Sequence, residues 1–295
     1  MRNKRLIVLN GLSRGGTNVV WNILQSHPDV CGTFLETGEI FYKRAFRWAP
    51  LSSRRLLTDP DKIDSLWASL LMRRADRVIH KHKMRTPAHP ELGCKYEGTP
   101  YMQEEVRRAA VCLKSNDEDI YLVPTFRKFY PDACFLGLIR NGYAWCNGWM
   151  RRGHTAAESG RVYLRLVQQL INYSEQMDRF ILLRWENVLA DPFGEAHRMF
   201  EFCGLEPLEI PQIRLKLKRV LSPDRQHQPR IGEENQHQWF GREDIAQALD
   251  RHIDQTQAGL LADSDREDFE REAKPVLDYF GYTPPAPSSS SEGGV

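Results

Sequence analysis

The sequence lacks a long apolar run, since no uninterrupted stretch approaches the ~20 residues that a membrane-spanning helix needs. Its first apolar stretch, residues 6–9, is also too short for the core of a signal peptide. An excess of either charge is missing as well, because 41 Lys and Arg and 39 Asp and Glu leave a formal net charge of +2. We therefore expect a cytoplasmic chain with no membrane span and no nucleic acid as partner.

The chain also lacks paired cysteines and internal repeats. Its six cysteines stand apart, with no Cys-x-x-Cys spacing: Cys31, Cys94, Cys112, Cys134, Cys146 and Cys203. In a chain of this length without a secretion signal, buried free thiols are the ordinary state of such residues. The spacing argues against a structural zinc site, and we expect no metal.

What the sequence does have is a glycine-rich turn near its N-terminus. Residues 6–9, Leu-Ile-Val-Leu, have the composition of a buried strand, and residues 11–16 supply three glycines. Apolar residues then recur at helical spacing, at Val19, Val20, Ile23 and Leu24. A strand, a glycine turn and a helix N-terminus form a cradle for a phosphate, because free N–H groups and the helix dipole favour an anion there. The plain alternative is a strand–turn–helix corner without a ligand.

The turn differs from the loop that binds nucleoside triphosphates, which reads Gly-x-x-x-x-Gly-Lys-Ser/Thr. Gly11 and Gly16 have the spacing of that loop, but Thr17 replaces its lysine and Asn18 its magnesium-binding hydroxyl. Arg14 is the one cation of the turn. These residues predict a phosphate site without the lysine and Mg²⁺ arrangement of a triphosphate site.

Short apolar strands alternate with helical patterns up to about residue 204, which predicts an α/β fold. We expect three layers, α/β/α, around a central parallel sheet of about four to five strands. Such sheets bind ligands at the carboxyl ends of their strands. Each expected strand is followed by a charged residue at that end: Arg14, Glu36, Lys114, Arg140 and Arg184. One crevice at this edge would hold two anionic groups and one carboxylate.

Three expectations concern the helices outside the phosphate turn. Asp59-Pro60 has the pattern of an N-cap acid followed by proline, which predicts the start of a helix. Residues 117–130 are expected to form one helix despite Pro124, and two C-terminal helices are expected at residues 243–261 and 266–279.

Residues 1–283 are expected to form a single domain. Within it, the polar segment 221–241 is expected to be a lid or a loop that covers the cofactor. The Pro/Ser/Gly tail at residues 284–295 is expected to be disordered. The basic run at residues 73–85 is either a solvated helix end or a patch for an acidic acceptor.

Two separated elements together resemble the sulfotransferases that use 3′-phosphoadenosine 5′-phosphosulfate (PAPS). The turn at residues 13–18, Ser-Arg-Gly-Gly-Thr-Asn, is similar to the family's 5′-phosphosulfate turn, and the strand before Arg140 is similar to its 3′-phosphate element. The resemblance covers residues 6–204 and looks closest to the bacterial and protein-tyrosine branches, whose turn carries arginine. Further matching segments are His27-Pro28, Pro131-Asp132, Arg184-Trp185-Glu186 and Asp191-Pro192.

This resemblance implies a P-loop-like fold, PAPS as donor, adenosine 3′,5′-bisphosphate as product and no required metal. It assigns the 5′-phosphosulfate to Ser13, Arg14, Gly15, Gly16, Thr17 and Asn18. It assigns the 3′-phosphate to Arg140, with Asn147 or the backbone of Gly148 in place of a family serine. The family's glycine-rich element over the adenine has no clean match, so Arg225 or Arg230 is expected to take its place.

Sulfuryl transfer also fits these residues on chemical grounds, because negative charge spreads over the sulfuryl and bridging oxygens in the transition state. Arg14 and the turn amides would stabilise that charge, and Lys114 would be a second cation at the sulfuryl group. The acceptor needs a base, for which Glu36 is the first choice and Glu39 the nearest competitor. The remaining candidates for the base are His80, His82 and His154.

Two other functions stay open at this point: a P-loop kinase or NTPase, and a catalytically silent nucleotide-binding scaffold. The missing lysine at position 17 weighs against the first. The presence of Arg14, Glu36 and Arg140 weighs against the second. The acceptor supplies a hydroxyl or an amine, and the sequence leaves open whether it is a small molecule, a carbohydrate, a lipid or a peptide.

Overall fold

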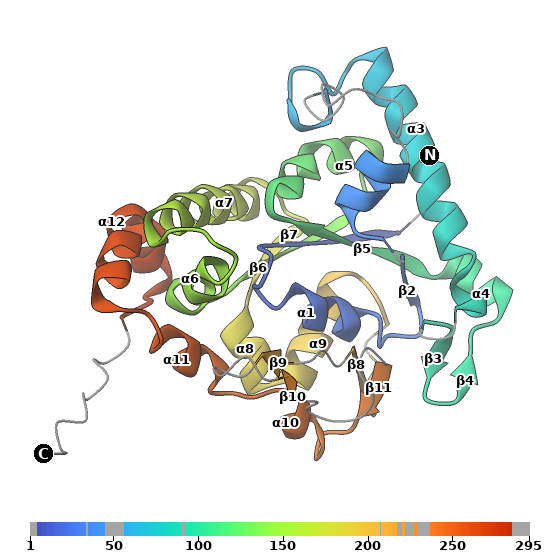
Figure 1. The fold of residues 1–295 in the computed structure, drawn as a ribbon. Helices are drawn as coiled ribbons and strands as arrows, with labels where there is room; N and C mark the ends of the chain where they lie inside the picture. The colour runs from blue at the N-terminus through green and yellow to red at the C-terminus, as the bar shows by residue number, and fades with distance from the viewer. Residues whose placement is uncertain are drawn as a thin grey trace, which may run out of the picture.

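The structure is a computed structural model. It describes residues 5–33, 35–44, 56–89, 92–206, 208–216, 220–221, 227–228 and 237–284. Figure 1 shows a central sheet with helices packed on both sides, so the predicted α/β/α architecture is confirmed.

The central sheet has five strands, all parallel, in the order β2-β5-β1-β6-β7. Their bounds are β1 Leu6–Gly11, β2 Val30–Gly32, β5 Ala110–Asn116, β6 Cys134–Ile139 and β7 Phe180–Arg184. The chain starts in the middle of the sheet, adds β2 and β5 on one side, and then crosses β1 to add β6 and β7 on the other. The turn after β1 therefore opens at the point where the strand order reverses, which is where such sheets bind ligands.

The strands are apolar throughout because both faces of the sheet are covered. Side chains alternate along β1: Leu6 and Val8 pack into one apolar cluster, and Ile7 and Leu9 pack into the other. The first cluster includes residues of α3 (Leu66–Lys83), α5 (Val123–Phe129), α6 (Gly142–Met150), α7 (Ala156–Gln176) and α12 (Asp263–Phe280). The second includes residues of α1 (Thr17–Leu24), α8 (Trp185–Ala190) and α9 (Pro192–Phe202).

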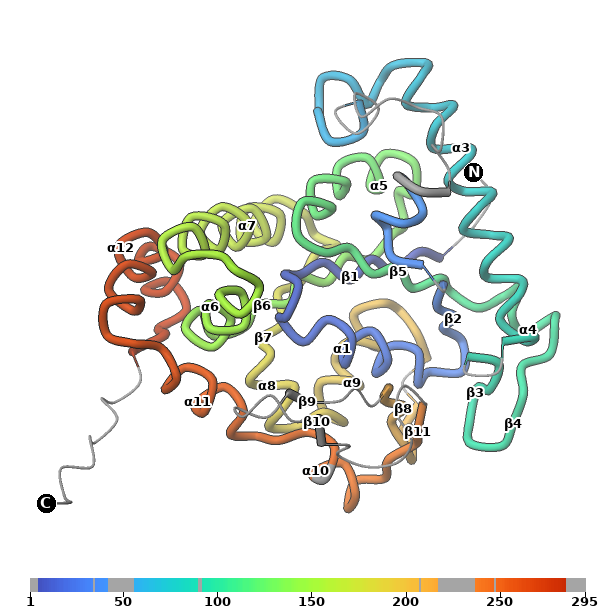
Figure 2. The backbone as a smooth tube through the Cα atoms, viewed as in Figure 1, coloured from blue at the N-terminus to red at the C-terminus, as the bar shows by residue number. Residues whose placement is uncertain are grey.

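The remaining elements lie around this core. They are η1 Glu39–Arg44, η2 Thr86–Ala88, β3 Cys94–Tyr96, β4 Thr99–Pro100, α4 Gln103–Arg108, η3 Asp117–Leu122, β8 Ile213–Lys216, β9 Val220–Leu221, β10 His227–Gln228, β11 His237–Phe240, α10 Ile245–Ala248 and α11 Ile253–Ala258. None of the helices in the described part of the chain is both long and apolar enough to cross a membrane. In Figure 2, α11 lies beside α6, and the two are joined by hydrogen bonds from Asn147 to Gln257.

The helix expected to open at Asp59-Pro60 starts later. Asp59 caps a turn, because its carboxylate accepts a hydrogen bond from the Asp61 N–H at 3.1 Å. The helix α3 begins at Leu66, where the Ser65 hydroxyl accepts from the Ala68 N–H at 3.1 Å. Ser65, which stands directly before the amphipathic pattern, caps the helix in place of Asp59.

Two other expected helices are each divided into two. Residues 117–130 form η3 and then α5, because Pro124 lacks an N–H and is tolerated only in the first turn of a new helix. Residues 243–261 form the short helices α10 and α11, which are separated by the segment 249–252. Most of the expected lid at residues 221–241, and all but the first residue of the expected tail at residues 284–295, lie outside the described residues.

Candidate active site

The phosphate turn joins β1 to α1 and has two residues in the left-handed region, Arg14 with φ 69° and Gly16 with φ 90°. Holding a non-glycine residue there costs about 1–3 kcal/mol, and such strain is concentrated at functional sites. Position 16 also has no room for a side chain, because a Cβ on Gly16 would lie 2.4 Å from the Trp185 ring. The Gly15 N–H closes the turn by donating to the Leu12 carbonyl at 2.9 Å.

Ser13 holds the turn to its surroundings. Its N–H and hydroxyl donate to the two carboxylate oxygens of Asp117, at 2.7 and 2.5 Å. Its carbonyl accepts from the indole Nε1 of Trp145 at 2.8 Å. The hydroxyl of Ser13, a predicted cofactor residue, therefore points to Asp117. Ser13 connects the turn to η3 through Asp117 and to α6 through Trp145.

Cations converge on Arg14. Burial lowers the pKa of its guanidinium, and the positive charges of Arg152, Arg140 and Arg151 lower it further. Gly148 brings α6 close, since a Cβ on it would lie 3.6 Å from the Arg14 Cβ. Four guanidinium groups near one turn make a field that favours a multiply charged anion.

A second group of side chains forms beside the turn, around Lys114 at the end of β5. Its Nζ, almost fully buried, forms an ion pair with the half-exposed Glu36 carboxylate at 2.6 Å and a short hydrogen bond to the Asn18 amide oxygen. Asn116 donates to the other Glu36 oxygen at 3.0 Å. The Lys114 ammonium also lies 5.2 Å from the centre of the Trp21 ring. Three predicted residues from three separate segments, Glu36, Lys114 and Asn18, thus meet at the edge of the sheet.

The other candidates for the base lie differently. The Glu39 carboxylate accepts a 3.4 Å hydrogen bond from the Glu36 N–H and so points back along its own chain. His154 stacks on Trp149 with ring centres 4.7 Å apart. His80 and His82 lie in the last turn of α3. The Glu36 carboxylate, in contrast, contacts the Lys114 ammonium.

The two side chains expected at the 3′-phosphate, those of Arg140 and Asn147, donate hydrogen bonds to residues of α11. Arg140 donates from Nε and Nη2 to one oxygen of Asp254, at 3.0 and 2.7 Å, and from Nη1 to the Arg14 carbonyl at 2.6 Å. Asn147 donates to the backbone and side-chain oxygens of Gln257, at 2.9 and 3.0 Å. The other Asp254 oxygen is buried and has no hydrogen-bond partner among the described residues.

A half-buried carboxylate that the sequence did not indicate as a site residue holds the backbone next to Arg140. Glu186, just after β7, accepts from the Asn141 N–H at 2.6 Å and from the Tyr282 hydroxyl at 3.1 Å. Burial raises the pKa of Glu186. Tyr163 donates to the Arg140 carbonyl at 2.6 Å. The segment Arg184-Trp185-Glu186 was the sequence signal for this network, whereas Asp254 and Gln257 had none.

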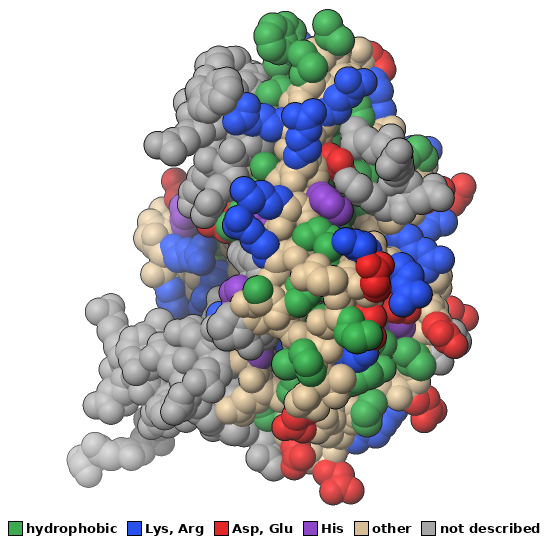
Figure 3. Space-filling view, turned by 90° about the vertical axis from the view of Figure 1, so that its right-hand side faces the viewer, with side chains coloured by type: hydrophobic (Ala, Val, Ile, Leu, Met, Phe, Trp, Pro, Cys, Tyr) green, Lys and Arg blue, Asp and Glu red, His purple; other side chains and the backbone are tan. Residues whose placement is uncertain are grey.

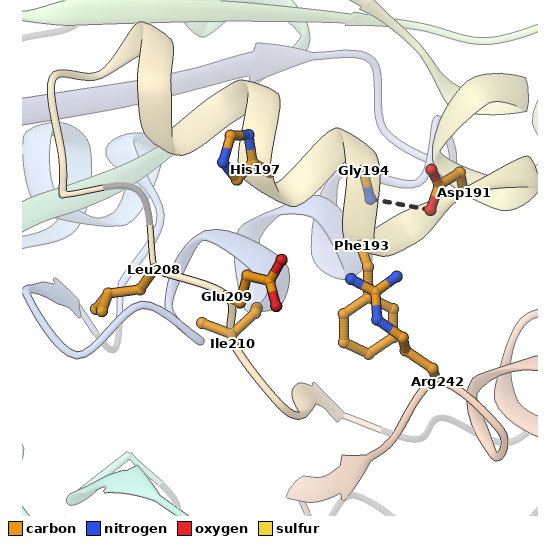
Figure 4. A pocket seen from close by; sticks show the side chains of 8 residues that line it. All are labelled: Asp191, Phe193, Gly194, His197, Leu208, Glu209, Ile210 and Arg242. Atoms are coloured by element: carbon orange, nitrogen blue, oxygen red, sulfur yellow. Dashed lines mark hydrogen bonds between the residues drawn. The ribbon is translucent and has the colours of Figure 1, made fainter.

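A cavity lies elsewhere, between α9 and the segment 208–210. It has a volume of about 290 Å³ and is lined by Asp191, Phe193, Gly194, His197, Leu208, Glu209, Ile210 and Arg242. Figure 4 shows the Arg242 guanidinium over the Phe193 ring, at 4.6 Å from its centre. Because none of these residues belongs to the phosphate turn or to the Lys114 group, the candidate site rests on convergent charges and not on this cavity.

Two predicted residues, Arg225 and Arg230, lie outside the described residues. Within the described part of the chain, no group of three or more His, Cys, Asp or Glu side chains could hold a metal ion. The six cysteines are free thiols.

The matches found in comparisons with known proteins are sulfotransferases. Residues 7–209 match the model of the sulfotransferase family. The fold is similar to the sulfotransferase domain from the Synechococcus PCC 7002 olefin synthase, with 14% identity, a TM-score of 0.55 and coverage of 96% of this chain and 98% of that one. It is also similar to the sulfotransferase domain from the curacin biosynthetic pathway, with 12% identity, a TM-score of 0.57 and coverage of 97% and 100%. No curated protein matches.

At these identities the two solved structures show the fold alone, and the family assignment comes from the sequence match. That match spans more than two thirds of the chain and includes the phosphate turn, Lys114 and Arg140. The chain belongs to the sulfotransferase family.

Proposed function

We propose that the protein transfers a sulfuryl group from PAPS to a hydroxyl or amine of an acceptor. The observation that carries the proposal is the pairing of a strained, arginine-bearing phosphate turn with Arg140, whose Nη1 donates to the Arg14 carbonyl at 2.6 Å. A donor with phosphates at both ends of its ribose needs cations at two linked places, and this pairing supplies them. Residues 1–283 would act as one catalytic domain.

The turn would bind the 5′-phosphosulfate. The amides of Gly16 and Thr17 stand at the N-terminus of α1, where free N–H groups and the helix dipole favour an anion, while the Gly15 N–H closes the turn by donating to the Leu12 carbonyl. Arg14 would add a fixed positive charge, which stabilises the leaving phosphate without giving up a proton. Charge stabilisation by preorganised donors would supply most of the rate acceleration, as it does in phosphoryl transfer.

The Lys114–Glu36 pair would act at the acceptor. Glu36 would take the proton of the acceptor hydroxyl while the acceptor oxygen attacks sulfur and the bond from sulfur to the bridging phosphate oxygen breaks. Lys114 would stabilise the sulfuryl oxygens. Asn116 fixes the second carboxylate oxygen at 3.0 Å, so one oxygen is held while the other faces the ammonium. The products would be a sulfated acceptor and adenosine 3′,5′-bisphosphate.

The 3′-phosphate would replace Asp254 at Arg140. Asp254 gives Arg140 two charge-assisted hydrogen bonds, and a phosphate would offer the same geometry with more charge. Binding of the donor would therefore be coupled to a shift of α11 away from α6.

Turnover tests the proposal. PAPS is incubated with the full chain and a panel of alcohols, phenols, sugars and amines, and adenosine 3′,5′-bisphosphate and sulfated product are measured together. We expect the two products in equal amounts for at least one acceptor, with no added metal. Formation of ADP from ATP and Mg²⁺, with no bisphosphate formed from PAPS, would identify a kinase or NTPase instead.

A further inference from the structure

The helix α3 carries a surface whose use the sulfuryl-transfer site does not explain. One side of α3 is buried through Ala68, Met72, Ala75 and Ile79, which recur at spacings of four, three and four residues. That side packs into the apolar cluster on one face of the sheet. The opposite side is exposed along the whole 18-residue helix, so α3 is a fixed part of the fold that presents one long stripe outward.

The first part of the stripe is apolar. The side chains of Leu66, Trp67 and Leu70 are exposed to 76%, 69% and 46%. They are three of the six large hydrophobic residues that are exposed in the described part of the chain, and they lie within the first two turns of one helix. Single exposed hydrophobic residues are ordinary, but such a group marks an interaction site.

The rest of the stripe is basic. Arg73, Arg77 and Lys81 are exposed and continue the same side of the helix, and Arg85 follows just after its end. Residues 66–85 contain six Lys and Arg but one acidic residue, Asp76, although the whole chain is nearly neutral. Asp76 accepts a hydrogen bond from Tyr130 at 2.8 Å, so its carboxylate faces the protein and not the stripe.

Figure 3 shows this side of the molecule. Hydrophobic side chains gather at the top of the view, and Lys and Arg side chains lie below them. The stripe is therefore graded along its length, from an apolar end to a basic end, and is not a mixture of the two.

From this gradient we infer that α3 docks the protein on the surface of an anionic lipid bilayer. The Leu66–Trp67–Leu70 end would enter the boundary between headgroups and acyl chains, where an indole is favoured. Arg73, Arg77 and Lys81 would lie over the anionic headgroups, each adding to the attraction. A polyanion such as a nucleic acid would use only the basic end, whereas a bilayer uses both ends in the order in which the helix presents them.

The test is co-sedimentation of the full chain with vesicles. One set of vesicles is phosphatidylcholine alone, and the other is phosphatidylcholine mixed with phosphatidylserine. We expect binding to the mixed vesicles, weak binding to the neutral ones, and loss of binding as NaCl rises from ~0.1 to ~1 M because screening weakens the headgroup contacts.

Three variants separate the contributions. Arg73→Gln/Arg77→Gln should weaken binding to the mixed vesicles about 25-fold, about fivefold for each charge removed. Leu66→Ser/Trp67→Ser should weaken binding to the mixed vesicles by at least about tenfold. The matched control, Tyr279→Ser/Arg271→Gln, removes an exposed aromatic residue and an exposed arginine on α12 and should bind as the original chain does.

All of these side chains are exposed, so unchanged thermal unfolding of the variants shows that docking and not folding has changed. The inference is overturned if the chain does not bind the mixed vesicles, or if the α3 variants bind as well as the control. It is also overturned if only the arginine variant loses binding, because binding that does not depend on Leu66 and Trp67 is the binding of a polyanion by the basic residues alone. None of these results depends on sulfuryl transfer, so the docking surface and the proposed function fail separately.

Discussion

Arg140 and Asp254 form an ion pair in which two guanidinium nitrogens share one carboxylate oxygen, at 3.0 and 2.7 Å. The two residues are 114 positions apart, at the end of β6 and in α11, and both side chains are largely buried. The second Asp254 oxygen is buried and has no hydrogen-bond partner in the part of the chain that the structure describes. In the proposed function Arg140 receives the 3′-phosphate, so Asp254 stands where that phosphate would bind and repels it.

Asp254→Asn should therefore tighten the binding of adenosine 3′,5′-bisphosphate. The amide keeps an oxygen for Arg140 but removes the negative charge that competes with the phosphate, and we expect Kd to fall about tenfold, which corresponds to about 1.4 kcal/mol. The affinity for adenosine 5′-phosphate, which has no 3′-phosphate, should not change. Isothermal titration calorimetry with the two nucleotides measures both values.

Arg140→Ala provides the opposite case. Loss of a charge-assisted contact should weaken the bisphosphate about 10- to 100-fold, again with little effect on adenosine 5′-phosphate. Weaker bisphosphate binding by Asp254→Asn, or equal losses for both nucleotides in Arg140→Ala, would show that Arg140 serves the fold and not the 3′-phosphate.

Glu36→Gln should separate donor binding from turnover. The glutamine keeps an acceptor for Asn116 but cannot take a proton, so the affinity for adenosine 3′,5′-bisphosphate should hold while kcat falls about 10²- to 10⁴-fold. Glu39→Gln is the matched control, since Glu39 is a neighbouring carboxylate that contacts the Glu36 N–H. If Glu39→Gln loses turnover and Glu36→Gln keeps it, the base is Glu39.

Gly16→Ala should destabilise the fold more than the same change at Gly153. Both glycines have similar backbone angles, φ 90° and φ 92°, so both substitutions strain the backbone. A Cβ on Gly16 would also collide with Trp185, whereas the space around Gly153 is empty within 4 Å. We expect a loss in free energy of unfolding of about 3 kcal/mol for Gly16→Ala and about 1 kcal/mol for Gly153→Ala, measured by urea unfolding. Equal losses of stability in the two variants would contradict this expectation, because they would mean that the turn moves and so avoids the collision with Trp185.

Glu186 should make stability depend on pH. Its pKa is raised in the folded protein by burial, so the folded state holds the proton more tightly than the unfolded state does. The stabilisation is complete below the unfolded-state pKa of about 4.3 and is lost as pH rises through the higher folded-state pKa. Glu186→Gln removes this titration, so the free energy of unfolding of the variant minus that of the original chain should increase as pH rises over the same interval. Urea unfolding of both proteins at several pH values measures this difference, and a difference that is flat or falls with pH would contradict it.

The phosphate turn and the charged strand ends could be predicted because their signals are local. An apolar run such as Leu6 to Leu9 beside a glycine turn indicates a buried strand. Because the strands of the sheet are parallel, their carboxyl ends then bring Glu36, Lys114 and Arg140 to one edge. The Asp117 contact with Ser13 was not predictable in the same way, because it depends on how η3 bends after β5. The position of Asp59 was misleading because a carboxylate caps a turn as readily as a helix.

The hydrogen bonds that α11 makes with Arg140 and Asn147 could not be predicted from the sequence. Asp254 and Gln257 lie in α11, a helix of six residues in a region where the apolar periodicity is weak. Their partners are 114 and 110 positions away, and no motif links segments so distant. Only packing of α11 against α6 reveals that the expected 3′-phosphate residues are already hydrogen-bonded.

The central claim is that the Arg14 turn and Arg140 together bind PAPS, and one binding measurement tests it most directly. The full chain is titrated in a calorimeter with adenosine 3′,5′-bisphosphate, with adenosine 5′-phosphate, and with ATP plus Mg²⁺. We predict that the bisphosphate binds at least about tenfold more tightly than either of the others. Tightest binding of ATP with Mg²⁺, or equal affinity for the bisphosphate and the 5′-phosphate, would contradict the claim.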